Sequence, residues 1–387
     1  QGKIQQLSVD EWLAWANIHS EGSNGSFLSQ LDKVSMTIAS LTAYEHQFTN
    51  LDYAMNNQDL GWLIKLSSDQ TNGSIFWPHD LNGAKKLVVN LDKLAISLTK
   101  EEKNAESKSQ LWPAIDLFIG DLSIDEVNVG RFELSAERNN KWILNSTTLQ
   151  SDHYTATLRS GEWSQTEAGD LTQFTLTLNS HDFGSVLTQF GYQKAIEAKQ
   201  VEVIASLKWA GTPLDFSSHL LNGELELEVG QGNLNDIEPG AAGRVFGLMS
   251  VAALPRRLAL NFSDLFSKGF NFDAITSSFQ IEKGIVSTDD FVLKGPSAKV
   301  EITGSANLIL QEYDQQVKIT PNLSSTLPLA GAVAGGPIGL GVGAALFVAD
   351  KLSGTLFGKN IVNLISYSYT LTGPWDNPEF HVLQTTQ

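Results

Sequence analysis

The chain has 387 residues and a formal net charge of -17, with 43 acidic against 26 basic side chains and no cysteine. The acidic excess opposes nucleic-acid binding and attraction to anionic lipid, because both depend on cationic side chains near phosphates. Any membrane contact would therefore have to be apolar. Without cysteine there are no disulfides or thiolate metal sites.

The first 110 residues are predicted to form a β-rich segment with one early helix and a polar, charged linker at its end. The pattern of residues 1–7 is typical of the middle of a strand, and Asp10 can cap a helix over Asp10–Ala16. Residues 100–110 carry the linker. Because no start methionine or signal peptide precedes this pattern, we expect a piece of a longer protein. Residues 111–387 are the second predicted region.

Apolar and polar residues alternate along almost the whole chain, which places one set of side chains on each face of a sheet. The clearest run is Glu224–Val229. Similar runs predict strands around residues 60–66, 154–158, 174–178, 201–209, 258–262, 275–281, 300–310 and 367–371. Short turns are predicted at Asn72-Gly73, Asn222-Gly223 and Lys283-Gly284.

Helical signals are few, so the fold class is mainly β. Asp182 can cap a helix over Asp182–Ile196, and a glycine-rich apolar helix is predicted over Ala241–Leu254. The strands must bury one face without many helices to cover it. They can close into a barrel, pair with a second sheet, or curl into an open groove filled by something apolar. The periodicity does not choose among these three.

Residues 319–349 contain no charged side chain. Gly335, Gly336 and Pro337 interrupt the stretch, and proline in a helix interior costs roughly 3 kcal/mol. We therefore predict an apolar helical hairpin over residues 327–353 that dips into lipid or plugs an apolar cavity, and not a membrane span. The candidate membrane-contacting residues are Leu329, Val333, Ile338, Leu340, Val342, Leu346 and Phe347. A buried core helix is the ordinary alternative, and a nucleotide-binding loop at residues 339–343 is a weaker one.

The chain carries no motif for catalysis or for a cofactor. Its seven histidines are scattered singly, and nucleophile-elbow and phosphate-loop patterns are absent. Neighbouring Asp289 and Asp290 point to opposite faces of a strand, and the aspartates at 116, 121 and 125 lack calcium-loop spacing. We predict no catalytic residue, no metal and no cofactor. Three arginines near apolar sequence could hold a lipid headgroup, although pairing with Asp264 or with a helix C-terminus is their more ordinary role: Arg244, Arg256 and Arg257.

Four segments of the second half resemble a known family. They are Gly243–Asp273 (GRVFGLMSVAALPRRLALNFSDLFSKGFNFD), Phe279–Leu308, Tyr313–Pro337 and Tyr367–Phe380 (YSYTLTGPWDNPEF). They are similar to the C-terminal region of the AsmA-like proteins, most of all the YhdP branch of Gram-negative bacteria. The resemblance is strong from Asp182 onward and weak before.

That resemblance implies an elongated, curved, mostly antiparallel β-sheet groove with an apolar interior, in the periplasm and attached to an inner-membrane anchor upstream. The implied function is to carry glycerophospholipid between the inner and outer membranes, with phospholipid and membrane as partners and no enzymatic activity. The candidate groove residues fall on the apolar phase of their strands: Leu225, Leu227, Val229, Leu258, Leu260, Phe262, Phe279, Ile281, Val300, Ile302, Leu308, Tyr367, Tyr369 and Leu371.

Two other classes compete with lipid transfer. A sheet that templates the assembly of outer-membrane proteins by strand addition would expose a sheet edge and bind polypeptide. An elongated β-helical enzyme acting on polysaccharide would need a cluster of charged residues on one exposed face, and the sequence has no such cluster.

Overall fold

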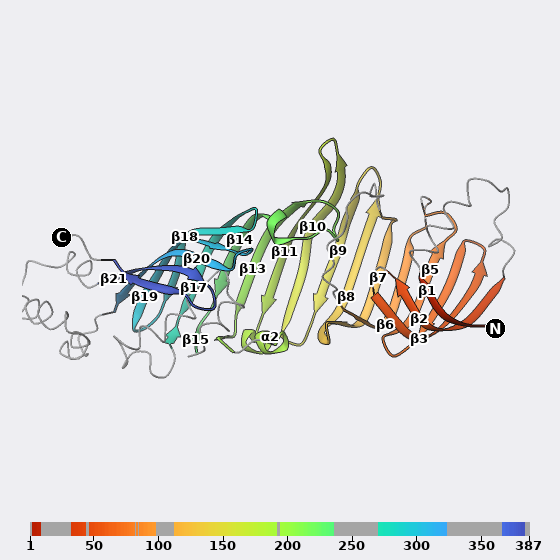
Figure 1. The fold of residues 1–387 in the computed structure, drawn as a ribbon, viewed down its shortest axis with the longest axis horizontal. Coiled ribbons are helices and arrows are strands. Elements are labelled where there is room, and N and C mark those ends of the chain that lie inside the picture. The colour runs from red at the N-terminus through yellow and green to blue at the C-terminus, as the bar shows by residue number, and fades with distance from the viewer. Residues whose placement is uncertain are drawn as a thin grey trace, which may run out of the picture. The chain divides into compact units, whose positions relative to one another are not determined.

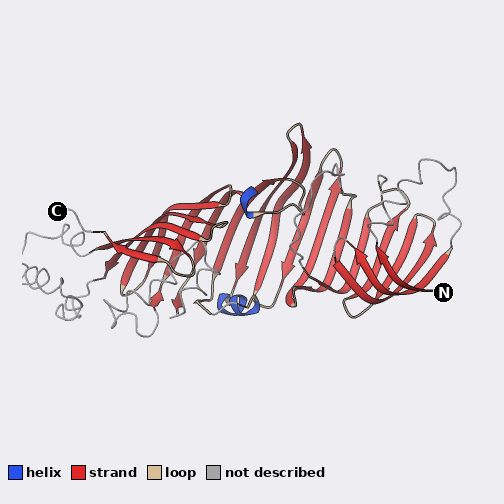
Figure 2. Ribbon diagram, viewed as in Figure 1, coloured by secondary structure: helices blue, strands red, loops and turns tan. Residues whose placement is uncertain are grey.

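The computed structural model describes residues 2–8, 32–43, 46–81, 83, 85–97, 112–191, 194–235, 270–322 and 366–383. Strands dominate these residues, which confirms the prediction of a mainly β fold (Figure 2). Nineteen strands belong to one large, mostly antiparallel open sheet, and three short strands form a second. The chain divides into two compact units, residues 1–176 with 210–215 and residues 177–209 with 216–387.

The first unit is built from strands that pair with their neighbours in chain order from β1 to β10 (Figure 1). Its strands are β1 (Gly2–Ser8), β2 (Lys33–Ala43), β3 (His46–Gln58), β4 (Gly61–Ser67), β5 (Thr71–Pro78), β6 (Leu87–Ile96), β7 (Ile115–Ile124), β8 (Val127–Arg138), β9 (Trp142–Gln150), β10 (Tyr154–Thr166) and most of β11 (Gly169–Ser180).

Two of these pairings are parallel, β1 with β2 and β6 with β7. Parallel neighbours need a long connection, because the chain must return to the end at which the first strand began. The connections satisfy this, since β1 ends at Ser8 and β2 begins at Lys33, and β6 ends at Ile96 and β7 begins at Ile115. The other neighbours are antiparallel and joined by shorter turns.

The second unit holds all or most of the remaining elements, and within it β17 to β22 pair in chain order. The elements are α2 (Phe183–Gln189), β12 (Ile196–Ala198), β13 (Val201–Ala210), the 3-10 turn η2 (Ser218–Leu220), β14 (Asn222–Val229), β15 (Gly232–Leu234), β16 (Phe270–Phe272), β17 (Ala274–Glu282), β18 (Ile285–Lys294), β19 (Ala298–Asn307), β20 (Glu312–Pro321), β21 (Tyr367–Pro374) and β22 (Glu379–Val382). The small sheet consists of β12, β15 and β16.

The helix predicted over Asp182–Ile196 is real but shorter. Asp182 is its N-cap, and its carboxylate accepts a hydrogen bond from the Ser185 backbone N–H at 3.1 Å. The helix ends at Gln189, and Gly191 follows with a φ of 78°, a left-handed conformation that stops a helix. Ile196 belongs to strand β12, so the C-terminal half of the prediction is wrong.

Only one of the three predicted glycine turns is a hairpin turn. Lys283 and Gly284 join β17 to β18 with φ values of 49° and 77°, the left-handed pair that a tight hairpin requires. Asn72-Gly73 and Asn222-Gly223 instead lie inside β5 and β14. A Cβ on Gly223 would meet the Ser206 backbone oxygen at 2.0 Å, so this glycine permits close strand approach.

Several predictions fall outside the described residues: the helix at residues 10–16, the linker at 100–110, the helix at 241–254 and the apolar hairpin at 327–353. Among the residues that are described, no helix combines the length and apolar character needed to cross a membrane.

Candidate apolar binding surface

The first unit carries an apolar row that crosses nine strands. Residues that pair directly across neighbouring strands share a face of the sheet. Followed from β2 to β10, one such row contains Met36, Tyr53, Leu66, Gly73, Leu91, Ile119, Phe132, Leu149 and Ala156. Every side chain in it is apolar or aromatic, apart from the glycine.

A second row on the same face runs beside the first, two residues away along each strand. It contains Val34, Met55, Ile64, Ile75, Val89, Leu117, Leu134, Thr147 and Leu158. Thr147 is its one polar member. The two rows together define what we call the apolar face of the first unit.

The opposite face is mostly polar. The row that lies between the two apolar rows along the strands, but on the other side of the sheet, contains Ser35, Ala54, Lys65, Ser74, Asn90, Phe118, Glu133, Thr148 and Thr157. Successive side chains therefore separate by polarity across the sheet, as the sequence alternation predicts.

The apolar face is only partly covered. Leu91 and Ile119 are buried and form a small core with Leu122 and Val129. Most other members of the two rows, such as Met36 and Ile64, are half-buried. Single exposed hydrophobic residues are normal on a protein surface, but a continuous apolar band indicates a binding site.

Gly73 keeps the first row continuous at the junction of β5 and β6. Its φ of 144° lies in the region that favours glycine, and a Cβ there would meet the Asn90 backbone oxygen at 2.4 Å. The register also shifts between Asn72 and Gly73, which marks an irregularity in the ladder. This glycine therefore lets β5 and β6 approach closely.

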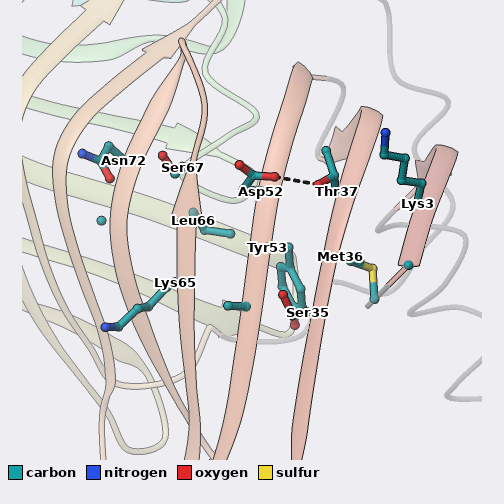
Figure 3. Close-up of a pocket in the computed structure, with 13 residues that line it drawn as sticks. Lys3, Ser35, Met36, Thr37, Asp52, Tyr53, Lys65, Leu66, Ser67 and Asn72 are labelled. Atoms are coloured by element: carbon teal, nitrogen blue, oxygen red, sulfur yellow. Dashed lines mark hydrogen bonds between the residues drawn. The ribbon is translucent and has the colours of Figure 1, made fainter.

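A hollow of about 750 Å³ lies over β1 to β5 in the first unit (Figure 3). Its lining includes Met36, Tyr53 and Leu66 of the first apolar row. Polar neighbours contribute as well, among them Thr37, whose hydroxyl donates to the Asp52 carboxylate at 2.7 Å. Burial raises the pKa of the Tyr53 hydroxyl, so tyrosine stays neutral here.

Three tryptophans pack beside the apolar face, just before β7, at the start of β9 and near the end of β10. The ring of Trp112 meets those of Trp142 and Trp163 edge-on, with centroids 5.1 Å and 5.5 Å apart. The Trp142 indole N–H donates to the Pro113 carbonyl oxygen at 3.1 Å. The buried Trp163 indole N–H has no acceptor among the described residues. It is a buried donor left available on an apolar wall.

The groove residues proposed from sequence lie elsewhere, in the second unit. The structure brings most of them onto one face, in rows such as Val229–Ile275–Leu293–Val300 and Phe291–Ile302–Val317–Tyr369. Eight of the groove candidates are buried, with at most 8 % of each side chain exposed: Leu227, Val229, Phe279, Ile281, Val300, Ile302, Tyr369 and Leu371. Their contact with lipid stays a prediction.

The remaining sequence candidates are less well placed or lie outside the described residues. Leu225 is half-buried in β14, and Leu308 lies in the turn after β19. Tyr367 belongs to β21. The other groove candidates at 258, 260 and 262, the arginines at 244, 256 and 257, and all seven membrane-contact candidates fall outside the described residues.

Two of the carboxylates considered for chemistry, Asp116 and Asp121, have structural partners. Burial disfavours the charged form of Asp116, but hydrogen bonds from the Ser135 hydroxyl and the Lys86 ammonium lower its pKa. Asp121 accepts a hydrogen bond from Asn128 at 2.9 Å. No group of metal-ligating side chains occurs within the described part of the chain. These contacts connect neighbouring strands of the sheet.

The fold and the surface define a class of protein: an open β-sheet protein whose distinctive surface is a long, half-covered apolar face. The chain belongs to the YhdP family, whose profile, described as "YhdP protein", matches residues 1–380. It is 24 % identical over 379 residues to the "Intermembrane phospholipid transporter YhdP" of Escherichia coli (strain K12). That alignment covers 96 % of this chain but only 29 % of the relative. No solved structure matches.

Proposed function

We propose that this chain is part of an intermembrane phospholipid transporter and that the apolar face of the first unit carries the acyl chains. The observation that supports this most is the pair of apolar rows across β2 to β10, left half-buried on a sheet whose other face is polar. A relative over nearly the whole chain bears the name of a phospholipid transporter, which supports the ligand class.

The size of the face suits an acyl chain. Strands lie about 4.8 Å apart, so a row over nine strands extends roughly 38 Å. One leaflet of a bilayer is about 15 Å deep in hydrocarbon, half of the roughly 30 Å core. Acyl chains therefore fit along the rows with room to move. Each CH2 that leaves water contributes about 0.8 kcal/mol, and an apolar wall without polar anchors holds a lipid without fixing its position.

Transfer on this surface is passive sliding along a wall of uniform polarity, and its direction comes from elsewhere in the full protein. The setting is the periplasm, with phospholipid and membrane as partners and an anchor in the inner membrane upstream. The role is non-catalytic. No observation on the described residues specifically favours the alternative, a module that assembles outer-membrane proteins.

A matched pair of substitutions tests the proposal. Ile64 and Leu63 are neighbouring isomers on β4, both half-buried, and they point to opposite faces. We expect Ile64→Asp to reduce phospholipid that co-purifies with the chain, measured by mass spectrometry, because a carboxylate interrupts the apolar row. Leu63→Asp should retain it at similar thermal stability. Equal lipid content in both variants would argue against the proposed surface.

A further inference from the structure

The second unit exposes a separate group of large hydrophobic side chains, all in or next to turns at one end of its strands. We call it the apolar turn cluster. Its members, with their exposed fractions, are Phe216 (57 %), Leu220 (38 %), Ile285 (46 %), Ile309 (45 %) and Leu310 (63 %).

Hydrogen bonds hold these turns side by side. The Gly284 N–H donates to the Leu221 carbonyl oxygen at 3.1 Å, which joins the β17–β18 turn to the segment after η2. The Leu308 N–H donates to the Gly284 carbonyl oxygen at 2.9 Å, which joins the β19–β20 turn to the same point. A Cβ on Gly284 would meet the Ser218 backbone oxygen at 2.5 Å and Ile309 Cδ1 at 3.2 Å, so the three segments are in close contact.

The backbone of these turns is largely hydrogen-bonded within the protein. Asn307 Oδ1 accepts from the N–H groups of Ile309 and Leu310 at 2.9 Å and 3.0 Å. Asn222 Oδ1 accepts from the Lys283 N–H at 3.1 Å, and its amide donates to the Leu220 carbonyl oxygen at 2.8 Å. Backbone groups that already have partners can leave water at low cost, which is the main requirement for entering lipid.

The chemistry of the cluster favours lipid over a protein partner. Energetically dominant residues in protein interfaces are enriched in Trp, Tyr and Arg, and leucine is under-represented among them. The cluster consists of leucine, isoleucine and phenylalanine, which partition favourably into a bilayer. The ring of Phe216 packs edge-on against that of Trp209, with centroids 5.4 Å apart. Lys283 is exposed and lies two residues before Ile285 in the β17–β18 turn. Its ammonium group can reach lipid phosphates while its aliphatic stem contacts apolar surface.

We propose that the apolar turn cluster is a membrane-docking edge, which inserts shallowly into the interfacial region of a phospholipid bilayer. The inference goes beyond acyl-chain carriage, because it assigns the place where the chain touches the bilayer surface.

The absence of native cysteine makes a site-specific test direct, since one introduced cysteine is the only labelling site. Leu310→Cys places a polarity-sensitive fluorophore in the cluster. Leu60→Cys is the matched control, because Leu60 is 56 % exposed in the turn between β3 and β4 of the first unit. On adding vesicles of phosphatidylethanolamine and phosphatidylglycerol, the label at 310 should shift its emission to shorter wavelength and be quenched by nitroxide-labelled lipid. The label at 60 should do neither.

Two results would overturn the inference. One is vesicle flotation of the labelled chain with no spectral change at 310, which would place the contact elsewhere. The other is a concentration-dependent shift at 310 without vesicles and unaffected by them, which would identify a protein–protein contact. As a second variant, Leu310→Glu should lower vesicle binding several-fold while co-purified lipid is unchanged. Loss of co-purified lipid with normal vesicle binding would instead challenge the acyl-chain surface.

Discussion

At the scale of single residues, glycines mark where neighbouring strands touch. Gly223 and Gly169 both have positive φ, 147° and 112°, but only Gly223 has backbone where a Cβ would stand. We expect Gly223→Ala to lose more stability than Gly169→Ala by about 1–3 kcal/mol, because the added methyl forces β13 and β14 apart. Urea unfolding of the two variants measures the difference. Equal losses would mean that backbone conformation alone accounts for the effect.

A carboxylate in the second unit should make stability depend on pH. Burial disfavours the charged form of Asp290, but hydrogen bonds from the Ser278 N–H and the hydroxyls of Thr288 and Ser277 hold its pKa below the ordinary value. Because the pKa of Asp290 is lower in the folded state than in the unfolded state, the charged carboxylate stabilises the fold above the ordinary pKa. That stabilisation is lost as pH falls through the folded-state pKa. Asp290→Asn should therefore be less stable than the parent at neutral pH.

The difference in stability between Asp290→Asn and the parent should shrink in acid, because Asp290 of the parent becomes protonated. Asp289→Asn is the matched control, because its neighbour at 290 keeps all three bonds. Thermal unfolding across the acidic range measures both variants. A constant gap between Asp290→Asn and the parent at every pH would show that the carboxylate charge is not involved.

At the scale of elements, the capping of α2 is a local contact with a predictable contribution. The Asp182 carboxylate accepts hydrogen bonds from the Ser185 N–H and, at 2.6 Å, from the Ser185 hydroxyl. Asp182→Ala should lower the free energy of unfolding by about 1 kcal/mol. Asp182→Asn retains an acceptor and should lose much less, as measured by urea unfolding. Equal losses would mean that the cap contributes little.

The sequence predicts which strands exist better than how they are connected or covered. Period-two alternation identifies β14 and places Leu227 and Glu226 on opposite faces, because side-chain direction is a local property. It misplaces Asn72-Gly73 in a turn, because an Asn-Gly pair occurs both in hairpin turns and where strands approach closely, and the sequence does not separate the two cases. It also predicts a helix to Ile196, although Gly191 ends α2 earlier.

The degree of burial of each apolar face depends on residues distant in sequence, so alternation cannot predict it. Sequence reasoning placed the groove candidates in the second half, where the family motifs are clearest. The described candidates there, such as Phe279 and Ile302, are buried. The half-covered rows instead lie in the first unit. The alternation at residues 60–66 and 154–158 predicts an apolar strand face there, but the register that joins such strands into continuous rows comes from the structure.

At the scale of the whole molecule, net charge and apolar surface have opposite effects on association with an anionic membrane. With a net charge of -17, association with anionic vesicles should be apolar, and raised salt should not weaken it, because screening weakens only charge-driven contacts. Flotation at low and physiological salt measures this. Loss of binding on raising salt would show that a basic patch dominates.

The central claim, that lipid lies on the apolar face of the first unit, is tested most directly with a photo-crosslinking amino acid at Val89 and at Val88. The two positions are neighbours on β6 with the same side chain but opposite faces, and Val88 is 40 % exposed on the polar face. Position 89 pairs with Leu117 in the apolar row. We predict phospholipid adducts at 89 and none at 88, detected by mass spectrometry. Equal capture at both positions, or capture at 88 alone, would contradict the account.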